Sequence, residues 1–180
     1  MPRAPTKTNL GPFIGIDPGK SGGISTVFQN CDPLVIPMPL TERDIWDSLS
    51  GHILGTVAVI EKVGGYTGEG QPGSRMFNFG KNYGSLLMAL TAAEISFEEV
   101  APQRWQQAFA VAPRKYKKVG KKKVWIETKR QFKERLRRKA QQIFPQLPIW
   151  SEPKSRGRQL AIADSLLIAE FCRRKHEGKL

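Results

Sequence analysis

Residues 12–28, PFIGIDPGKSGGISTVF, contain two short apolar runs separated by a turn rich in proline and glycine. The first run, 12–17, predicts a buried β-strand that ends at Asp17, and the Asp-Pro-Gly sequence is typical of a tight turn. The second run, 24–28, lies at hairpin distance from the first, so we expect the two strands to pair. This stretch therefore starts a sheet and leaves a carboxylate at the end of a buried strand.

Two further acids also lie in apolar surroundings. Glu61 directly follows the apolar run 57–60, and Asp164 lies within the apolar stretch 160–169. A carboxylate at a buried edge requires a partner, and a divalent cation is a strong one. Together with Asp17, these residues predict a metal site assembled from distant parts of the chain.

Each acid also has a purely structural interpretation. Asp17 can accept backbone hydrogen bonds within its turn. Glu61 can pair with Lys62 or with a lysine on a helix. Asp164 can lie in a first helical turn, where the helix dipole stabilises an acid. The coincidence of three such acids favours the metal site.

The order of predicted elements defines the fold class. A β-β-β-α-β-α-β-α-α-α order favours an α/β fold, with a five-stranded mixed sheet and helices on both faces. The strands that carry Asp17 and Glu61 should be neighbours, with both acids at the sheet edge where such folds bind ligands. A glycine-rich loop is expected at 64–75 and a lysine-rich loop at 113–125. The predicted strands are 12–17, 24–28, 35–40 (an edge strand), 56–63 and 96–100, and the predicted helices are 42–54, 78–94, 102–109, 127–144 and 159–175.

Composition limits the class of protein and its partners. The 180 residues fit one domain over 12–175, with a basic N-terminal arm at 1–11 and a short tail at 176–180. A net charge of +13 implies a polyanionic partner. Cys31 and Cys172 lack zinc-site spacing and are interpreted as free thiols in a reducing, cytoplasmic setting. The sequence contains no segment of membrane-spanning length and no apolar core of a secretory signal.

Five segments, in order, resemble the RuvC-type Holliday junction resolvases, and most closely the phage-like and RuvC-like branch of the ribonuclease H-like nucleases. They are IGIDPGKSGGI (14–24), VAVIEKVGG (57–65), SRMFNFGKNYGSLLMAL (74–90), FEEVAPQRWQQAF (97–109) and ADSLLIAEF (163–171). The resemblance implies a ribonuclease H-like fold and a homodimer. It also implies metal-dependent cleavage of four-way DNA junctions, leaving a 5′-phosphate, and pairing of two copies through the helix predicted at 78–94.

The resemblance also implies roles for particular residues. Asp17, Glu61 and Asp164 match the family's metal-binding catalytic acids, and Lys129 resembles a lysine near the scissile phosphate, with Lys123 as the other candidate. Oxygen-only ligands select Mg²⁺ or Mn²⁺. Two such ions about 4 Å apart activate water and stabilise the leaving oxygen.

One family position differs in this chain. The family usually has a fourth acid or a histidine three or four residues before the last acid, where this chain has Ala161 and Leu160. Neither side chain can bind a metal. The nearest upstream acid is Glu152, whose spacing does not match the family pattern.

The basic stretch 114–139 is the main candidate for DNA contact. It contains only two acids, Glu127 and Glu134, so a phosphate-binding surface is favoured over a solvated helix face. Tyr66 is the aromatic nearest to Glu61 in the glycine loop and is a candidate for stacking on an unpaired base. Phe77 and Phe79 are expected in the core or at the dimer contact. The predicted DNA-binding residues are Tyr66, Arg75, Lys81, Arg104, Lys115, Lys117, Lys118, Lys121, Lys122, Lys123 and Arg130.

Three other functions are compatible with parts of the sequence. An actin-like or sugar-kinase-like ATPase also begins with a strand and a glycine turn, but we find no second phosphate loop and expect no nucleotide cofactor. A nuclease of the same fold can act on other branched DNA or on RNA. A junction-binding protein with impaired catalysis would explain the absent fourth ligand.

Overall fold

A mixed sheet forms the centre of the molecule. The structure is a computed structural model that describes residues 11–64, 73–120, 122–152 and 155–180. Within these ranges the main sheet has five strands in the order β3-β2-β1-β4-β5. Strand β1 pairs antiparallel with β2 and parallel with β4. The strands are β1 (Phe13–Asp17), β2 (Gly23–Val27), β3 (Leu34–Pro37), β4 (Val57–Glu61) and β5 (Ser96–Val100).

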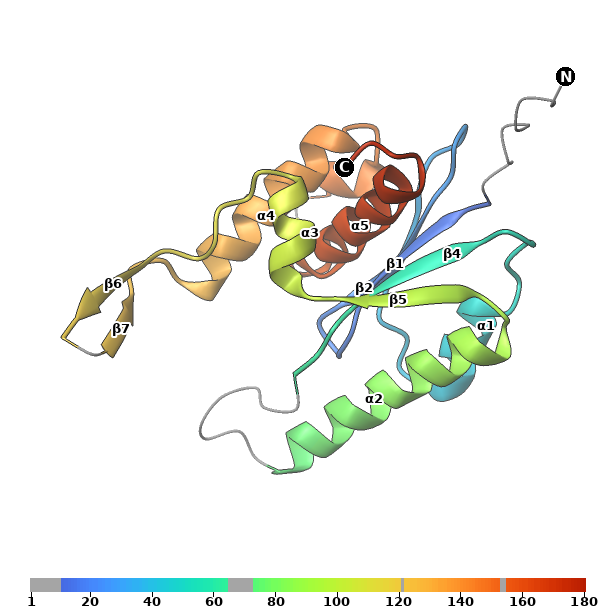
Figure 1. Cartoon of the computed structure of the whole chain (residues 1–180), viewed down its shortest axis with the longest axis horizontal. Coiled ribbons are helices and arrows are strands. Elements are labelled where there is room, and N and C mark those ends of the chain that lie inside the picture. Colours follow the sequence, from blue (N-terminus) through green and yellow to red (C-terminus); the bar gives the residue numbers. More distant parts are fainter. Residues whose placement is uncertain (1–10, 65–72, 121, 153–154) are drawn as a thin grey trace, which may run out of the picture.

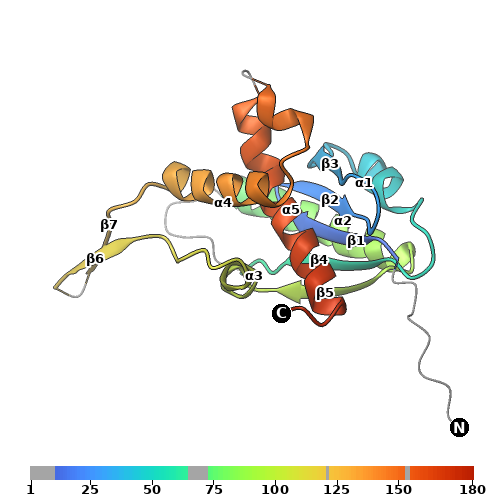
Figure 2. The same ribbon diagram turned by 90° about the horizontal axis from the view of Figure 1, so that it is seen from above.

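Helices cover both faces of this sheet, as predicted. Helices α1 and α2 lie on one face, and α3, α4 and α5 lie on the other (Figures 1 and 2). The predicted edge position of the third strand is also confirmed, because β3 ends the sheet. The helices are α1 (Glu42–Leu49), α2 (Gly73–Ala92), α3 (Pro102–Ala108), α4 (Lys129–Ile143), the 3-10 helix η1 (Pro148–Ser151) and α5 (Arg156–His176).

Strand β1 lies directly against helix α5. Ile14 and Ile16 pack toward α1 and α2, so the alternate residues of β1 face α5. A Cβ atom on Gly15 would lie only 2.1 Å from the backbone nitrogen of Ala169, so only glycine permits this close approach. A buried hydrogen bond of 2.7 Å between the hydroxyls of Ser25 and Ser165 fixes the helix along the sheet.

Several boundaries differ from the sequence prediction. The helix predicted at 42–54 ends at Leu49, and the backbone N–H of the C-cap residue Ser50 donates a hydrogen bond to the carbonyl of Trp46. Ile53 is exposed and does not lie on an apolar helix face. Helix α2 begins at Gly73, so the end of the predicted glycine loop is helical.

The lysine-rich loop predicted at 113–125 is instead largely a β-hairpin. It is formed by β6 (Tyr116–Val119) and β7 (Lys122–Trp125), paired antiparallel with Tyr116 opposite Trp125. The lysines obscured this pattern because they occupy both faces of each strand. Figure 1 shows the hairpin projecting away from the sheet.

Other sequence-level expectations concern the termini and cysteines. Residues 1–10 of the predicted basic arm lie outside the described residues, while the N–H of Gly11 donates to the carbonyl of Gly55. Cys31 is exposed and Cys172 is buried, and both are free thiols. In the described ranges, no helix has the length and apolar character needed to cross a bilayer.

Candidate active site at the ends of β1 and β4

Asp17 and Glu61 end two adjacent parallel strands, as predicted. The last register pair between β1 and β4 joins Ile16 to Ile60, and the two acids follow at the same edge of the sheet. Asp17 is only 8% exposed, and Glu61 is partly buried. Open α/β sheets bind ligands at this carboxyl edge.

Asp164 joins this edge from helix α5. It is 4% exposed and lies well inside the helix, which begins at Arg156, so a first-turn dipole contact does not explain it. Among the described residues, its Oδ1 atom is buried without a hydrogen-bond partner. A buried acceptor without a partner is costly and marks a position where a ligand is favoured.

Lys133 of α4 brings two of the acids together. Its Nζ atom bonds Oδ2 of Asp164 and lies 3.5 Å from Oδ2 of Asp17. Asp17 and Asp164 therefore contact the same cation.

The family resemblance implies a position near the scissile phosphate for Lys129. In the structure Lys129 is exposed at the start of α4, and Lys133 is the lysine that contacts the acids. Lys133 lies one turn further along the helix. Its spacing in the sequence indicates this position, because Lys133 lies three residues before the buried Leu136 and seven before the buried Ala140. Residues at these spacings share one helix face, so Lys133 lies on the face of α4 that packs against the core.

Glu61 has a different partner. The indole N–H of the buried Trp105, from α3, donates to Oε2 of Glu61 at 2.9 Å. Sequence reasoning did not identify this contact. The sequence contains one indication of this contact. A helix that starts with a proline and contains Trp105 follows β5, and β5 pairs with β4, which ends at Glu61.

Burial favours the neutral forms of all three acids, and repulsion from Asp164 adds to this effect at Asp17 and Glu61. Burial, followed by repulsion from Asp164, raises the pKa of Glu61 to about 7, although Trp105 and Lys133 oppose the shift. Burial and then the charge of Asp164 raise the pKa of Asp17. Burial also raises the pKa of Asp164, against the effect of Lys133.

The donor set fits a hard divalent cation in its chemistry. All three side chains offer oxygen only, their charges repel one another, and Oδ1 of Asp164 is unsatisfied. As the side chains stand in the described residues, no group of three or more Asp, Glu, His or Cys is arranged to hold a metal ion. The ammonium of Lys133 compensates the carboxylates in this arrangement, so metal binding requires the side chains to turn.

Leu160 and Ala161, at the positions where the resembled family has a fourth acid or a histidine, have no side-chain atom that can bind a metal. Leu160 and Ala161 are half-buried on α5, close to Asp164 in sequence. Glu152 is exposed at the end of η1.

The predicted DNA-binding residues lie in two regions. Those on or beside the hairpin are exposed: Lys115, Lys117, Lys118, Lys122, Lys123 and Arg130. Arg104 is exposed on α3. Tyr66 and Lys121 lie outside the described residues.

The start of α2 forms the second region. Arg75, Lys20 and Phe79 line a groove between α2 and the turn that follows Asp17. The ring of Phe79 lies against Gly19, whereas Phe77 is exposed rather than in the core. Lys81 forms an exposed ion pair with Glu42.

The sheet order and the helix layers define a RuvC-like, ribonuclease H-like α/β fold. Among solved structures, the chain is similar to T. thermophilus RuvC in complex with Holliday junction substrate. The TM-score is 0.57 at 16% identity, over 94% of this chain and 97% of that chain. A second structure of Thermus thermophilus RuvC gives a TM-score of 0.51 at 15% identity, over 92% and 96% of the two chains. No protein-family model and no curated protein matches the chain.

Proposed function

We propose that the protein is a structure-selective DNA endonuclease that cleaves four-way junctions by metal-dependent phosphodiester hydrolysis, in DNA recombination, repair or the resolution of replication products. The observation that carries the proposal is the convergence of Asp17 and Asp164 on one cation, next to Glu61 on the adjoining strand. The fold supports a nuclease, and the junction substrate in the similar RuvC structure supports the choice of substrate.

Asp17, Glu61 and Asp164 would hold Mg²⁺, for which Mn²⁺ can substitute, in a two-ion site. When bound, these ions supply an activated water and neutralise charge at the phosphate. The hydrogen bond from Trp105 orients the Glu61 carboxylate for this task. Released from the acids, the Lys133 ammonium can stabilise charge that develops on the scissile phosphate.

The proposal is tested with Asp17→Asn, which keeps the side-chain shape but removes a charge. We expect this variant to lose nicking of a four-way junction in Mg²⁺ or Mn²⁺ while its junction affinity remains within about threefold of wild type. The matched control is Asp47→Asn, at an exposed ion pair on α1, which should nick normally. An active Asp17→Asn protein would overturn the assignment.

The same assay separates the alternative functions. Four-way junctions, flaps, plain duplex and RNA–DNA hybrids are compared side by side with the wild-type protein. Faster cleavage of flaps or hybrids favours another nuclease of this fold. Junction binding without nicking in either metal favours a catalytically impaired binding protein.

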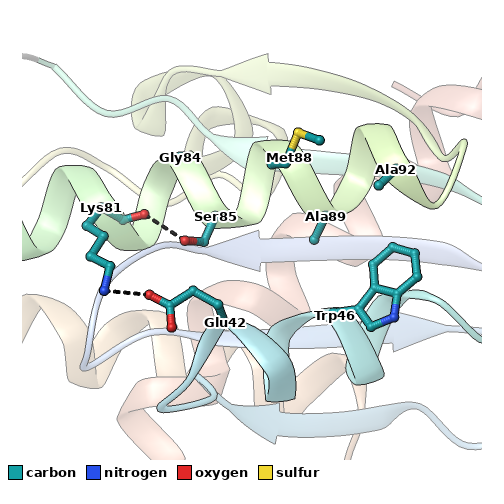
Figure 3. Close-up of a pocket in the computed structure, with 8 residues that line it drawn as sticks. All are labelled: Glu42, Trp46, Lys81, Gly84, Ser85, Met88, Ala89 and Ala92. Carbon is teal, nitrogen blue, oxygen red and sulfur yellow. Dashed lines mark hydrogen bonds and ion pairs between the residues drawn. The ribbon is translucent and has the colours of Figure 1, made fainter.

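We also propose that two copies pair through α2. Figure 3 shows Gly84, Met88 and Ala92 on α2, where they line a pocket together with residues of α1. Met88 is 65% exposed, and nothing lies within 4 Å of a Cβ built on Gly84, so a second helix can approach closely. Met88→Glu should convert a dimer into a monomer in sedimentation equilibrium. A wild-type monomer at micromolar concentrations would contradict the proposal.

A further inference from the structure

The β6–β7 hairpin presents its side chains to solvent on both faces. Every residue of β6 and β7 is exposed, and two views show the hairpin extending away from the helices and the main sheet (Figures 1 and 2). A two-stranded hairpin is only marginally stable by itself. Its large exposed apolar residues, including Trp125 at 50% and Tyr116 at 40%, therefore indicate a binding surface.

The strand register separates two kinds of face. Tyr116 opposes Trp125 and Lys118 opposes Lys123, so these four side chains share one face, which we call the aromatic face. The rings of Tyr116 and Trp125 meet edge to face, with centroids 5.6 Å apart. The opposite face combines two valines with two lysines: Lys117, Val119, Lys122 and Val124.

Cations flank both rings of the aromatic face. The Nζ atom of Lys123 lies 4.8 Å from the centre of the Tyr116 ring, and Cζ of Arg114 lies 4.3 Å from that of Trp125. The sequence from 111 to 126 contains no acid. This combination of positive charge and accessible rings matches nucleic acid with unpaired bases, because phosphates pair with the cations while bases stack on the rings. Bases inside a duplex are already stacked and do not expose their faces.

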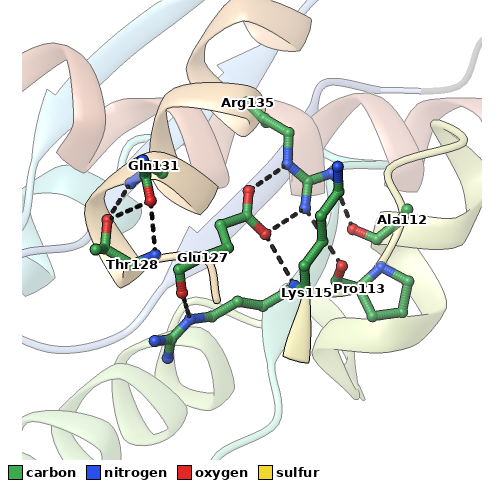
Figure 4. Close-up of polar contacts among 8 residues, drawn as sticks. Ala112, Pro113, Lys115, Glu127, Thr128, Gln131 and Arg135 are labelled. Atoms are coloured by element: carbon green, nitrogen blue, oxygen red, sulfur yellow. Dashed lines mark hydrogen bonds and ion pairs between the residues drawn. The ribbon is translucent and has the colours of Figure 1, made fainter. Parts of the chain in front are cut away.

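The root of the hairpin is fastened to α4. The carboxylate of Glu127 accepts hydrogen bonds from Arg135 at 2.8 and 3.0 Å and from the backbone N–H of Lys115 at 3.0 Å (Figure 4). Arg135 also donates to the carbonyl of Ala112 at 3.0 Å, and Arg114 donates to the carbonyl of Glu127 at 2.6 Å. These bonds fix both ends of the hairpin against one turn of α4.

The same helix reaches the acids. Helix α4 starts at Lys129, directly after the capping residue Thr128, and its next turn carries Lys133 to Asp17 and Asp164. At a rise of about 1.5 Å per residue, Lys133 lies roughly 6 Å along the helix from Lys129. The hairpin and the candidate active site are therefore held at a defined separation by one rigid element.

We propose that the aromatic face of the hairpin stacks on an unpaired base at the branch point of the DNA and so aligns the branch with the acids. This inference rests on the proposed function for its branched substrate. It differs from the stacking expected at Tyr66, which belongs to another loop. The ligand class is single-stranded or branch-point nucleic acid.

The test uses Trp125→Ala and Tyr116→Ala in the full chain, with Trp125→Phe as the variant that keeps a stacking ring. The probes are a four-way junction with 2-aminopurine at the branch, a gapped duplex with 2-aminopurine in the gap, and a fully paired duplex. We expect each alanine variant to lose roughly 5- to 100-fold in affinity for the junction and the gapped duplex, as base stacking on an aromatic side chain implies. Affinity for paired duplex should change less than about threefold, and Trp125→Phe should stay close to wild type.

A matched pair on the opposite face separates charge from stacking. Lys117→Ala with Lys122→Ala should weaken binding to all three DNAs alike. Equal losses on all DNAs for Trp125→Ala would overturn the inference. So would an unchanged affinity for gapped DNA, or an altered oligomeric state by light scattering with unchanged DNA binding.

The gapped duplex keeps the two proposals distinguishable. A wild-type protein that does not prefer junctions over duplex contradicts the proposed function alone. The stacking inference is then decided by whether Trp125→Ala loses affinity and 2-aminopurine response on the gapped duplex.

Discussion

The indole nitrogen of Trp105 lies 2.9 Å from Oε2 of Glu61 and donates a hydrogen bond to it. This contact joins α3 to the end of β4 and holds the partly exposed acid of the site in one orientation. Trp105 itself is fully buried, so its ring is fixed by the core. Glu61 is therefore positioned from the core, by a side chain that is itself buried.

Replacing Trp105 by phenylalanine tests this positioning. Trp105→Phe removes the N–H donor and leaves a small cavity, which should lower the free energy of unfolding by about 1–3 kcal/mol. We expect junction nicking to fall about tenfold at saturating DNA, because the Glu61 carboxylate loses its orientation. Single-turnover nicking and urea unfolding measure the two effects.

Trp150 provides the matched control. Its indole N–H donates to the backbone carbonyl of Phe144 at 2.8 Å and not to one of the three acids. Trp150→Phe should lower stability by a similar amount and leave the nicking rate unchanged. Equal nicking by both variants would show that the contact with Glu61 has no positioning role.

Stability should depend on pH through Glu61. Its pKa rises from 4.5 to about 7 on folding, so between these values the folded state binds more protons than the unfolded state. The free energy of unfolding therefore falls as pH rises through this window. The stabilisation linked to the protonated Glu61 is complete only below pH 4.5 and is lost as pH rises through about 7. Glu61→Gln removes the effect and retains an acceptor for Trp105. In EDTA at pH 8, the free energy of unfolding of this variant should exceed that of wild type by about 1–2 kcal/mol, after allowance for the partial exposure of Glu61. Near pH 4 the two values should be equal. Urea unfolding at both pH values measures this, and a constant difference would contradict the assignment.

Lys133 and Lys129 should differ when each is replaced by methionine. Lys133→Met leaves Asp17 and Asp164 without their shared cation, so the metal-free protein should lose about 2–4 kcal/mol. Mg²⁺ should restore much of this loss and raise the melting temperature more than in wild type, because it no longer competes with the ammonium. Nicking should slow at least tenfold.

The exposed Lys129 gives the comparison within the same helix. Lys129→Met should leave both the melting temperature and its response to Mg²⁺ unchanged. A nicking defect larger in Lys129→Met than in Lys133→Met would favour the lysine proposed from the sequence.

Gly15 should tolerate no side chain. Gly15→Ala places a methyl group 2.1 Å from the backbone nitrogen of Ala169 in α5, and the required shift should lower the free energy of unfolding by about 3 kcal/mol or more. The control is Gly157→Ala at the start of α5, where nothing lies within 4 Å of the added atom. That change should be neutral or stabilise by up to about 1 kcal/mol. Thermal unfolding of both variants tests the close approach.

Junction affinity should decrease steeply with salt. Each phosphate contacted contributes a slope of about −0.9 in a plot of log affinity against log salt concentration. Removing the two hairpin lysines Lys118 and Lys123 should make this slope less steep by about one to two units. Fluorescence anisotropy between low and moderate salt measures it, and a flat response in wild type would argue against a phosphate-binding surface.

The sequence was most informative where local patterns carry the information. An apolar run ending in Asp17 and a second run ending in Glu61 predicted neighbouring strands, and the register confirms it. Trp105 and Lys133 were not predicted because their roles depend on which helices cover which strand ends. A tryptophan and a lysine have many other uses, and no local pattern distinguishes these.

The hairpin was missed for a different reason. A strand with one buried face alternates apolar and polar residues, but β6 and β7 have no buried face. The lysines at 117, 118, 122 and 123 therefore predicted a lysine-rich loop and not a pair of strands. Glu127, which fastens the hairpin to Arg135, was recognised only as one of two acids in a basic stretch.

The close approach at Gly15 restricts movement of β1 relative to α5. Since α5 touches the backbone of β1 there, and Ser165 is bonded to Ser25, neither element can slide without breaking the core. The backbone positions that carry Asp17 and Asp164 are therefore fixed relative to each other. Rearrangement at the site therefore has to come from rotation of the side chains around Lys133, while the contact between β1 and α5 stays fixed.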